Sequence, residues 1–140
     1  MKILIAVDGS PYTKRTLAYL AAHDEWLGNR HQYTVIHAVL EVPHRAAAFV
    51  GSEAVRKFHE EDAEAVFKPI RAFFQQQGIE ANFVFVVGHP ADQIARFAED
   101  GKFDLLVMGS RGHGELMNLV LGSVATQVLA RCSTPVLLVR

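Results

Sequence analysis

The chain has 140 residues, a length that suits one domain and is enough to bury a core without disulfides or metals. Half of the residues are hydrophobic and 21% are charged, a balance that excludes a disordered chain. The net charge of -1 gives no basis for a general attraction to nucleic acid or to an anionic membrane. Cys132 is the only cysteine, which excludes an intramolecular disulfide and a cysteine metal cluster.

The amino terminus is apolar for only a few residues before Asp8 and Gly9. That stretch is too short for the apolar region of a signal peptide, and no other apolar run approaches the roughly 20 residues that span a bilayer. We therefore expect a soluble, cytoplasmic protein with no membrane insertion, folded as a single domain over residues 1–140.

Five short runs rich in branched and aromatic residues predict strands that are covered on both faces. They are residues 2–7 (KILIAV), 33–39 (YTVIHAV), 81–87 (ANFVFVV), 104–108 (DLLVM) and 135–139 (PVLLV). Helical patterns lie between them and begin at Ser10 with Pro11, at Ser52, at Pro90 and at Ser123. The second pattern runs to Gln77, and Pro69 within it predicts a kink or a junction.

The resulting order, βαβαβαβαβ, predicts a doubly wound parallel sheet with helices on both faces. Ligands of such sheets bind beyond the carboxyl ends of the strands, where the strand order reverses. Three segments can line that crevice: residues 8–10 (DGS) after the first strand, Ala38 and Val39 at the end of the second, and the stretch from Gly109 after the fourth.

Glycines dominate the stretch after the fourth strand. Gly109, Gly112 and Gly114 follow the strand directly, and Gly122 with Ser123 opens the next helix. Glycines let successive N–H groups approach one anion, and a helix start offers unpaired N–H groups with a partial positive charge. The pattern therefore predicts an anion site, with a tight turn followed by a helix cap as the equally weighted alternative.

Two familiar phosphate motifs do not fit this stretch. Glu115 and Leu116 stand where a Walker loop requires Lys and Ser or Thr. Met117 stands at the third glycine position of a dinucleotide fingerprint, and no matching acidic residue follows.

At this point the sequence resembles the universal stress protein family. Its nucleotide-binding branch carries Gly-x2-Gly-x9-Gly-(Ser/Thr) after the fourth strand, which Gly109, Gly112, Gly122 and Ser123 match. The supporting features, in chain order, are residues 3–10 (ILIAVDGS), His37 with Ala38, residues 88–90 (GHP) and residues 133–139 (STPVLLV). The resemblance implies a Rossmann-like five-stranded sheet in the order 3-2-1-4-5.

The resemblance also implies an adenine nucleotide cleft that holds ATP, or AMP or ADP, with Mg²⁺ as an optional companion of the phosphates. The implied nucleotide-binding residues are Ala6, Val7, Asp8, Ala38, Met108, Gly109, Arg111, Gly112, Gly122, Ser123 and Val124. Asp8 would lie near the ribose and adenine, and the backbone of Ala38 near the adenine edge. Gly109 would face the ribose, and residues 112 and 122–124 would surround the phosphates.

This chain departs from the family pattern at two positions. Ala6 replaces a proline that some ATP-binding relatives have, and Ala38 replaces a common valine. Both changes remove side-chain bulk beside the adenine, and neither removes a phosphate contact. The resemblance further implies a homodimer through the closing strand from Pro135 to Val139.

Simpler structural roles are open for several of these residues. Asp8 can be a turn former, and Arg111 can be exposed. His113 is expected to be a solvated loop residue, His37 a hydrogen-bonded core residue and Cys132 a structural thiol. The apolar residues 116–121 are either core, or a partner surface, or a lid over the cleft.

The leading hypothesis is an ATP-binding regulatory protein of the stress response with little or no turnover. The sequence assigns no catalytic residue and no metal ligand, since it has no Walker lysine and Glu115 is the nearest acidic residue to the phosphate stretch. The alternatives are a slow Mg-dependent ATPase or nucleotide-transfer enzyme, and an adaptor that binds an unknown protein partner without nucleotide.

Overall fold

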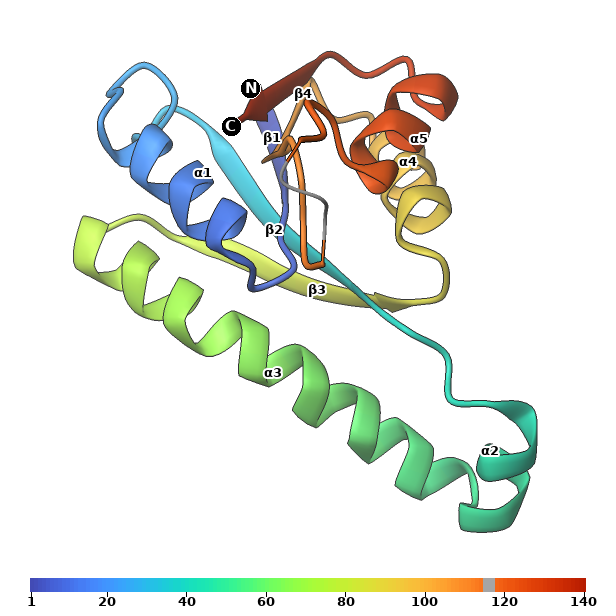
Figure 1. Ribbon diagram of the computed structural model, residues 1–140. Helices are drawn as coiled ribbons and strands as arrows, with labels where there is room; N and C mark the ends of the chain where they lie inside the picture. The colour runs from blue at the N-terminus through green and yellow to red at the C-terminus, as the bar shows by residue number, and fades with distance from the viewer. Residues whose placement is uncertain (115–117) are drawn as a thin grey trace.

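A five-stranded parallel sheet forms the centre of the molecule in the computed structural model, which describes residues 1–114 and 118–140 (Figure 1). The strand order is β3-β2-β1-β4-β5, so the predicted doubly wound fold and its order are confirmed. The strands are β1 (Lys2–Ala6), β2 (Gln32–Val39), β3 (Ala81–Val87), β4 (Leu105–Gly109) and β5 (Val136–Val139). Each lies within one residue of its predicted bounds.

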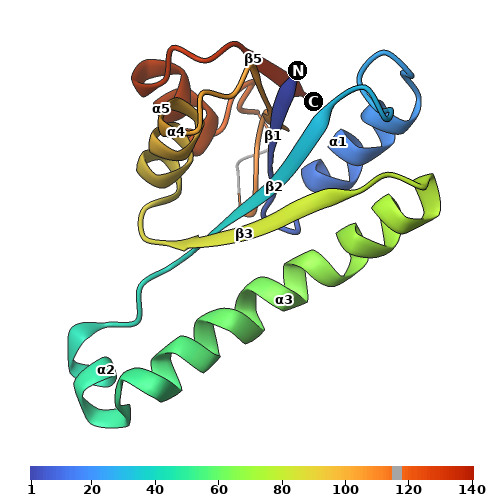
Figure 2. The same cartoon turned by 180° about the vertical axis from the view of Figure 1, so that it is seen from behind.

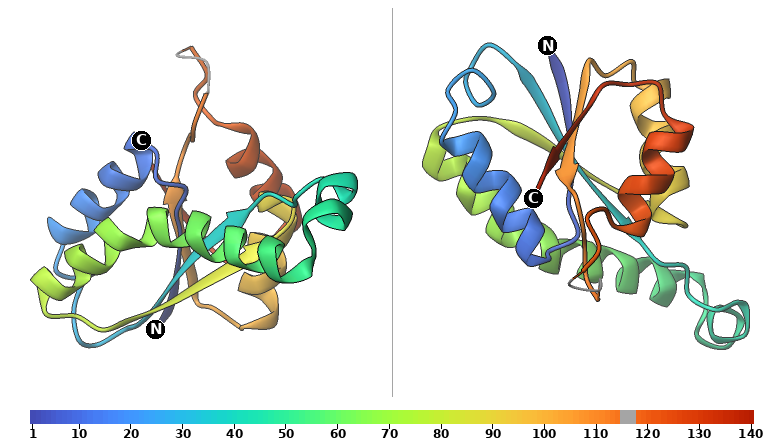
Figure 3. Two further views of the ribbon diagram at one scale, coloured as in Figure 1. Left: turned by 90° about the horizontal axis from the view of Figure 1, so that it is seen from below. Right: turned by 45° about the horizontal axis from the view of Figure 1, so that its top comes forward.

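Helices cover both faces of the sheet, as Figure 3 shows. The helices α1 (Pro11–Ala21) and α3 (Ser52–Gln77) lie on one side, and α4 (Pro90–Asp100) and α5 (Ser123–Arg131) on the other. The first pair buries Leu17, Leu20, Phe67 and Ile70 against the sheet. The second pair buries a smaller set rich in alanine, namely Ala91, Ile94, Ala98, Ala125 and Val128.

The helix α2 (His44–Val50) was not predicted. None of its residues is buried, and Phe49 is 92% exposed, so the segment has no apolar stripe facing the core from which its period could be read. Figures 1 and 3 show α2 and the start of α3 extending away from the sheet as a pair.

The junction expected at Pro69 does not occur, because α3 is one helix of 26 residues that includes it. Proline removes the hydrogen bond to the carbonyl of the residue four positions earlier, which is Ala65. Both Pro69 and Ala65 are exposed, so water can bind the carbonyl that loses its partner. The solvent-facing position therefore explains how the helix tolerates the proline.

The loop between α1 and β2 is held by Tyr33 at the amino end of the sheet. Its hydroxyl donates to the carbonyl of Trp26 at 2.7 Å and accepts from the N–H of Gly28 at 2.8 Å. Burial raises the pKa of the Tyr33 phenol above its ordinary value of 10.0, and the hydrogen bond from Gly28 partly offsets that rise. A buried phenol with satisfied hydrogen bonds fixes this loop to the core.

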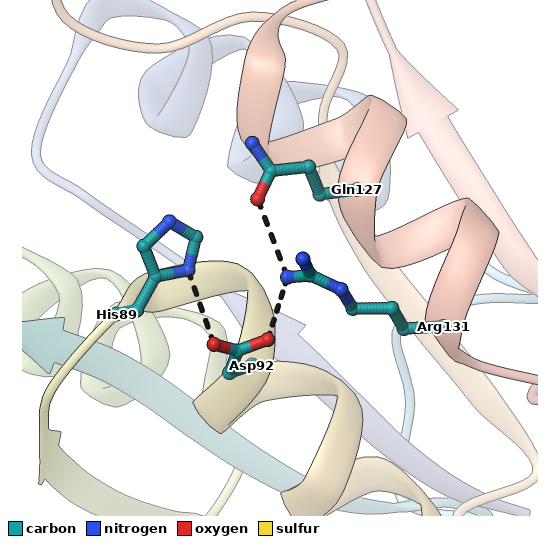
Figure 4. A network of polar contacts seen from close by, with 4 residues as sticks. All are labelled: His89, Asp92, Gln127 and Arg131. Carbon is teal, nitrogen blue, oxygen red and sulfur yellow. Dashed lines mark hydrogen bonds and ion pairs between the residues drawn. The ribbon is translucent and has the colours of Figure 1, made fainter.

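Polar contacts join α4 to α5 at the surface (Figure 4). Arg131 donates to Asp92 at 2.5 Å and to Gln127 at 3.3 Å, while His89 Nδ1 lies 3.7 Å from the other Asp92 oxygen. These side chains are about half exposed, so the network stabilises the fold by only about 0–1 kcal/mol per pair.

A second contact joins the end of α4 to the segment that leads into β5. Ser133 donates from both its hydroxyl and its backbone N–H to Glu99. The hydrogen bond from the Ser133 hydroxyl has the largest effect, and the one from its backbone N–H the next largest. Both lower the pKa of the Glu99 carboxyl below its ordinary value of 4.5.

Candidate functional site

A cleft of about 600 Å³ opens at the carboxyl ends of β1, β2 and β4. It lies where the strand order reverses between β1 and β4, the position at which doubly wound sheets bind ligands. All eleven residues predicted from the resemblance line it: Ala6, Val7, Asp8, Ala38, Met108, Gly109, Arg111, Gly112, Gly122, Ser123 and Val124. The structure therefore brings the whole predicted set together.

A wider groove of about 1400 Å³ lies at the opposite, amino end of the strands. Its walls include Lys2, Gln32 and Ala81, which begin their strands, and none of the eleven predicted residues contributes to it. The smaller cleft is the better candidate, because it stands at the carboxyl ends of the strands and faces a helix start.

Further cleft residues were not found from the sequence. They are Tyr12 and Thr13 from α1, Leu40 after the end of β2, Asp62 and Val66 from α3, Pro90 and Ile94 from α4, and Ala125 from α5. The first-turn positions of α1 and α5 could have been proposed, since those turns follow directly on predicted site residues. Asp62 had no signal, because its approach to the cleft depends on how the long α3 crosses the sheet.

Asp8 stands in a tight turn between β1 and α1. Its Oδ1 accepts from the N–H of Ser10 at 2.9 Å and from the hydroxyl of Thr13 at 3.1 Å. The Thr13 oxygen in turn accepts from the N–H groups of Asp8 and Gly9 at 3.1 and 3.2 Å. Asp8 is thus a turn former through Oδ1, while its second oxygen, Oδ2, faces the segment after β4.

Two glycines at the end of β4 and just after it, Gly109 and Gly112, lie very close to α1 and to the turn after β1. A Cβ atom on Gly109 would lie 2.7 Å from the Cβ of Tyr12, and one on Gly112 would lie 2.5 Å from Asp8 Oδ2. Both distances are far below van der Waals contact. These glycines are therefore required by packing within the protein itself.

Arg111 and His113 flank Gly112 and have different surroundings. Arg111 is half buried, lines the cleft and lies over the ring of Tyr12, 4.9 Å from its centroid. His113 is exposed, as expected, but its Nε2 lies 2.8 Å from the backbone carbonyl oxygen of Asp8. The exposed position of His113 was predicted, and its hydrogen bond to the Asp8 carbonyl was not.

The start of α5 opens into the cleft. Gly122, and not Ser123, is its N-cap residue, and Ser123 is the first residue of the helix. The N–H of Gly122 donates to the carbonyl of Ser110 at 2.7 Å, which fixes the helix start to the end of β4. The first turn carries no acidic residue, so its partial positive charge faces the cleft without a carboxylate from that turn.

Charges are divided between the two sides of the cleft. The carboxylate of Asp62 comes from α3, while Arg111 and the start of α5 come from the side of β4 and β5. Asp8 lies between them, with its Oδ2 against Gly112. An elongated ligand with hydroxyl or amino donors at one end and an anion at the other fits this division.

His37 and Cys132 have structural positions. His37 is 9% exposed, and its Nδ1 lies 2.8 Å from the carbonyl oxygen of Val7, as expected for a hydrogen-bonded core histidine. Cys132 is half buried and packs beside α4 and α5. Across residues 1–114 and 118–140, no three His, Cys, Asp or Glu side chains are grouped closely enough to hold a metal ion.

Leu116 and Met117 of the expected apolar run, and the acidic residue Glu115, lie outside the described residues. Of the remaining run, Leu119 and Val120 are 39% and 75% exposed, while Leu121 packs against the core cluster beneath α4 and α5. Among the described helices, none is both long and apolar enough to cross a membrane.

The fold and the cleft define the class: a doubly wound α/β protein with a helix start facing a cleft at its switch point. The model of the universal stress protein family matches residues 1–140. A universal stress protein of Thermus aquaticus is 37% identical over 138 residues, covering 99% of this chain and 97% of the relative. The chain belongs to the universal stress protein family.

Two further relatives show how the chain compares in length and shape. It is 32% identical to the universal stress protein Slr1230 of Synechocystis, but spans only 42% of that protein's length. The solved structure of the protein MJ0577 superposes with a TM-score of 0.82 at 29% identity, covering 99% of this chain and 94% of MJ0577.

Proposed function

We propose that this protein binds ATP or a related adenine nucleotide in the cleft at the carboxyl ends of β1, β2 and β4. It would act in the cytoplasm as a stress-response regulator with little or no turnover, through nucleotide-dependent contacts with a protein partner. The proposal takes the whole chain as one domain of this kind. The observation that carries it is the convergence of all eleven expected residues on one cleft with a helix start.

Relatives of the same fold support an adenine nucleotide. A protein from Arabidopsis thaliana was solved with AMP bound, one from Archaeoglobus fulgidus with dAMP, and a further universal stress protein with cAMP. These chains share the fold with TM-scores of 0.64 to 0.71. The adenine base is common to all three ligands, whereas their sugar and phosphate parts differ.

The charge division suggests how a nucleotide would lie. Its phosphates would meet the start of α5, the backbone at Gly112 and the guanidinium of Arg111. The nucleoside would extend past Ala6 toward Ala38 and Asp62, where carboxylate and backbone groups can accept hydrogen bonds from hydroxyl and amino groups.

Magnesium would be held mainly by the phosphates and by water, since Mg²⁺ commonly uses only one or two protein carboxylates in nucleotide sites. Asp8 Oδ2 fits that limited role, because it faces the glycine segment while Oδ1 is engaged in the turn. Magnesium would neutralise phosphate charge.

Calorimetry with ATP, AMP and cAMP tests the proposal. We expect saturable binding of at least one of them, and mass spectrometry of small molecules released from the purified protein should find an adenine nucleotide. Absence of binding by all three at millimolar concentration would overturn the proposal. A phosphate-release assay with magnesium then measures turnover, which should not exceed that of a mock preparation.

We also propose that two copies pair through β5. The carbonyls of Pro135 and Val139 accept from the N–H groups of Leu106 and Ser110 of the β4 side, so the backbone groups of the alternate residues face outward. An edge strand with free backbone groups is a template for pairing. Sedimentation should give a dimer, and Leu138→Pro, which removes one outward N–H, should give a folded monomer. A monomeric wild-type protein would reject this pairing.

A further inference from the structure

His113 makes a long-range hydrogen bond beside the proposed phosphate site. Its Nε2 lies 2.8 Å from the backbone oxygen of Asp8, which is 105 residues away in the chain. A carbonyl oxygen can only accept, so this contact requires the hydrogen on Nε2. Figures 1 and 2 show the turn after β1 and the loop after β4 leaving the same end of the sheet side by side.

Two packing contacts support the same placement. The main chain at Gly112 lies against Asp8 Oδ2, and the main chain at Gly109 lies against Tyr12, each too close for a side chain. Packing alone allows a glycine segment to slide or lift, because glycine has the widest backbone freedom. The His113 bond is directional and lies at the end of the stretch 109–113, so it adds a hydrogen bond to the packing contact at Gly112.

The anchor on the other side is rigid. Asp8 is tied to Ser10 and Thr13 by the reciprocal bonds of its turn, and that turn leads directly into α1. A hydrogen bond to the Asp8 carbonyl therefore connects the glycine segment to a fixed part of the fold.

We propose that His113 is a positioning residue that holds the backbone of residues 109–113 ready for phosphate before any nucleotide binds. The inference rests on the proposed function. His113 lines the cleft, and the role proposed for it is exerted through the Asp8 carbonyl. Without the His113 hydrogen bond, residues 109–113 would have to become ordered when the nucleotide binds. The entropy lost in that ordering would weaken the affinity. The loss should fall on ligands with phosphates and spare the nucleoside.

Side-chain geometry supplies matched variants. The amide nitrogen of glutamine reaches about as far from the backbone as Nε2, whereas the amide nitrogen of asparagine corresponds to Nδ1. His113→Gln can therefore restore the bond to Asp8, and His113→Asn and His113→Ala cannot. His31→Ala is the control, because His31 Nε2 also bonds a backbone carbonyl, that of Glu25 at 3.0 Å, but lies at the amino end of the sheet.

Binding of ATP and of adenosine to these five proteins tests the proposal. We expect His113→Ala and His113→Asn to bind ATP about three- to tenfold more weakly, with adenosine affinity unchanged. His113→Gln should bind ATP within twofold of the wild type, as should His31→Ala. Equal affinity of His113→Ala and wild type for ATP, an equal loss for adenosine, or an equal loss in His31→Ala would overturn the proposal.

Hydrogen exchange of the nucleotide-free proteins separates this inference from the proposed function. The amides of Gly112 and His113 should exchange faster in His113→Ala than in wild type, with an unchanged melting temperature. Unchanged exchange would indicate that the side chain orders nothing before binding, and would reject the positioning role. If wild type binds no nucleotide, the proposed function fails, while faster exchange in His113→Ala would still establish the anchor.

Discussion

The two sides of the cleft are built differently. On the side of β1 and β4, the Asp8 turn, Gly112 and His113 are joined by short hydrogen bonds and by backbone packing. On the side of β2 and α3, Ala38 is small, Leu40 is 72% exposed and Asp62 is exposed. The first side is suited to fixing phosphates in one geometry, and the second leaves room for the nucleoside to adjust.

Gly112→Ala, on the side of β1 and β4, is expected to cause the largest loss of stability and of ATP affinity. The added Cβ would lie 2.5 Å from Asp8 Oδ2, so the segment or the turn must move. We expect a loss of about 1–3 kcal/mol in the free energy of unfolding, and ATP binding weaker by roughly ten- to a hundredfold. Denaturant unfolding and calorimetry measure both quantities.

Gly28→Ala is the control for this change, since its Cβ would make only an ordinary contact of 3.6 Å with the Asp24 carbonyl. If strain against Asp8 is the cause, Asp8→Ala should recover stability in the Gly112→Ala background. Additive losses in the double variant would contradict that explanation.

The next largest effect is expected from Ser123→Ala at the start of α5. Removing a hydroxyl that bonds a phosphate should weaken ATP binding by about tenfold and leave adenosine binding unchanged. Ser52→Ala provides the comparison, because Ser52 occupies the same first position in α3, away from the cleft. A similar loss for adenosine would place the Ser123 hydroxyl at the nucleoside instead.

Ala38→Val, on the side of β2 and α3, is expected to strengthen nucleotide binding by a smaller factor. The added methyl groups would fill space beside the nucleoside, and burying them should tighten ATP and adenosine binding by about two- to fourfold. Weaker binding of both ligands would show that this side is already closely filled and would remove the contrast between the two walls.

The smallest effect lies outside both walls, at Glu99. Hydrogen bonds from Ser133 lower the pKa of its carboxyl in the folded state, so the stabilisation is present above pH 4.5 and is lost as the pH falls through the lower, folded value. Thermal melting from about pH 7 to about pH 3 should fall less steeply for Glu99→Gln than for wild type. If the melting temperatures of the two proteins fall in parallel with pH, other residues cause the loss of stability in acid.

Most of the fold could be predicted because its signals are local. Continuous apolar runs marked the five strands, and Pro90 and the pair Gly122 and Ser123 marked two helix starts. The helix α2 was missed because no residue in it is buried, so its sequence carries no stripe. Of the two outcomes expected at Pro69, the junction does not occur, because the proline lies on the water-facing side of α3.

The site shows the same limit. Residues on the glycine motif and at strand ends could be placed from sequence, since a parallel sheet brings strand ends together. The bond from His113 to Asp8 and the approach of Asp62 could not, because each depends on tertiary contacts between distant segments. The glycines of the motif also have a structural reason that the sequence did not reveal. Tyr12 lies against Gly109 and Asp8 lies against Gly112, and each leaves little room for a side chain.

The hydrogen bond between Tyr33 and Trp26 has a consequence for optical measurements. Trp26 is the only tryptophan, and it lies in the loop that Tyr33 fixes at the amino end of the sheet, away from the cleft. Its fluorescence should therefore change when this loop and the core beneath it unfold, and stay constant when nucleotide binds. Trp26 emission is therefore expected to report folding of this part of the chain separately from events in the cleft.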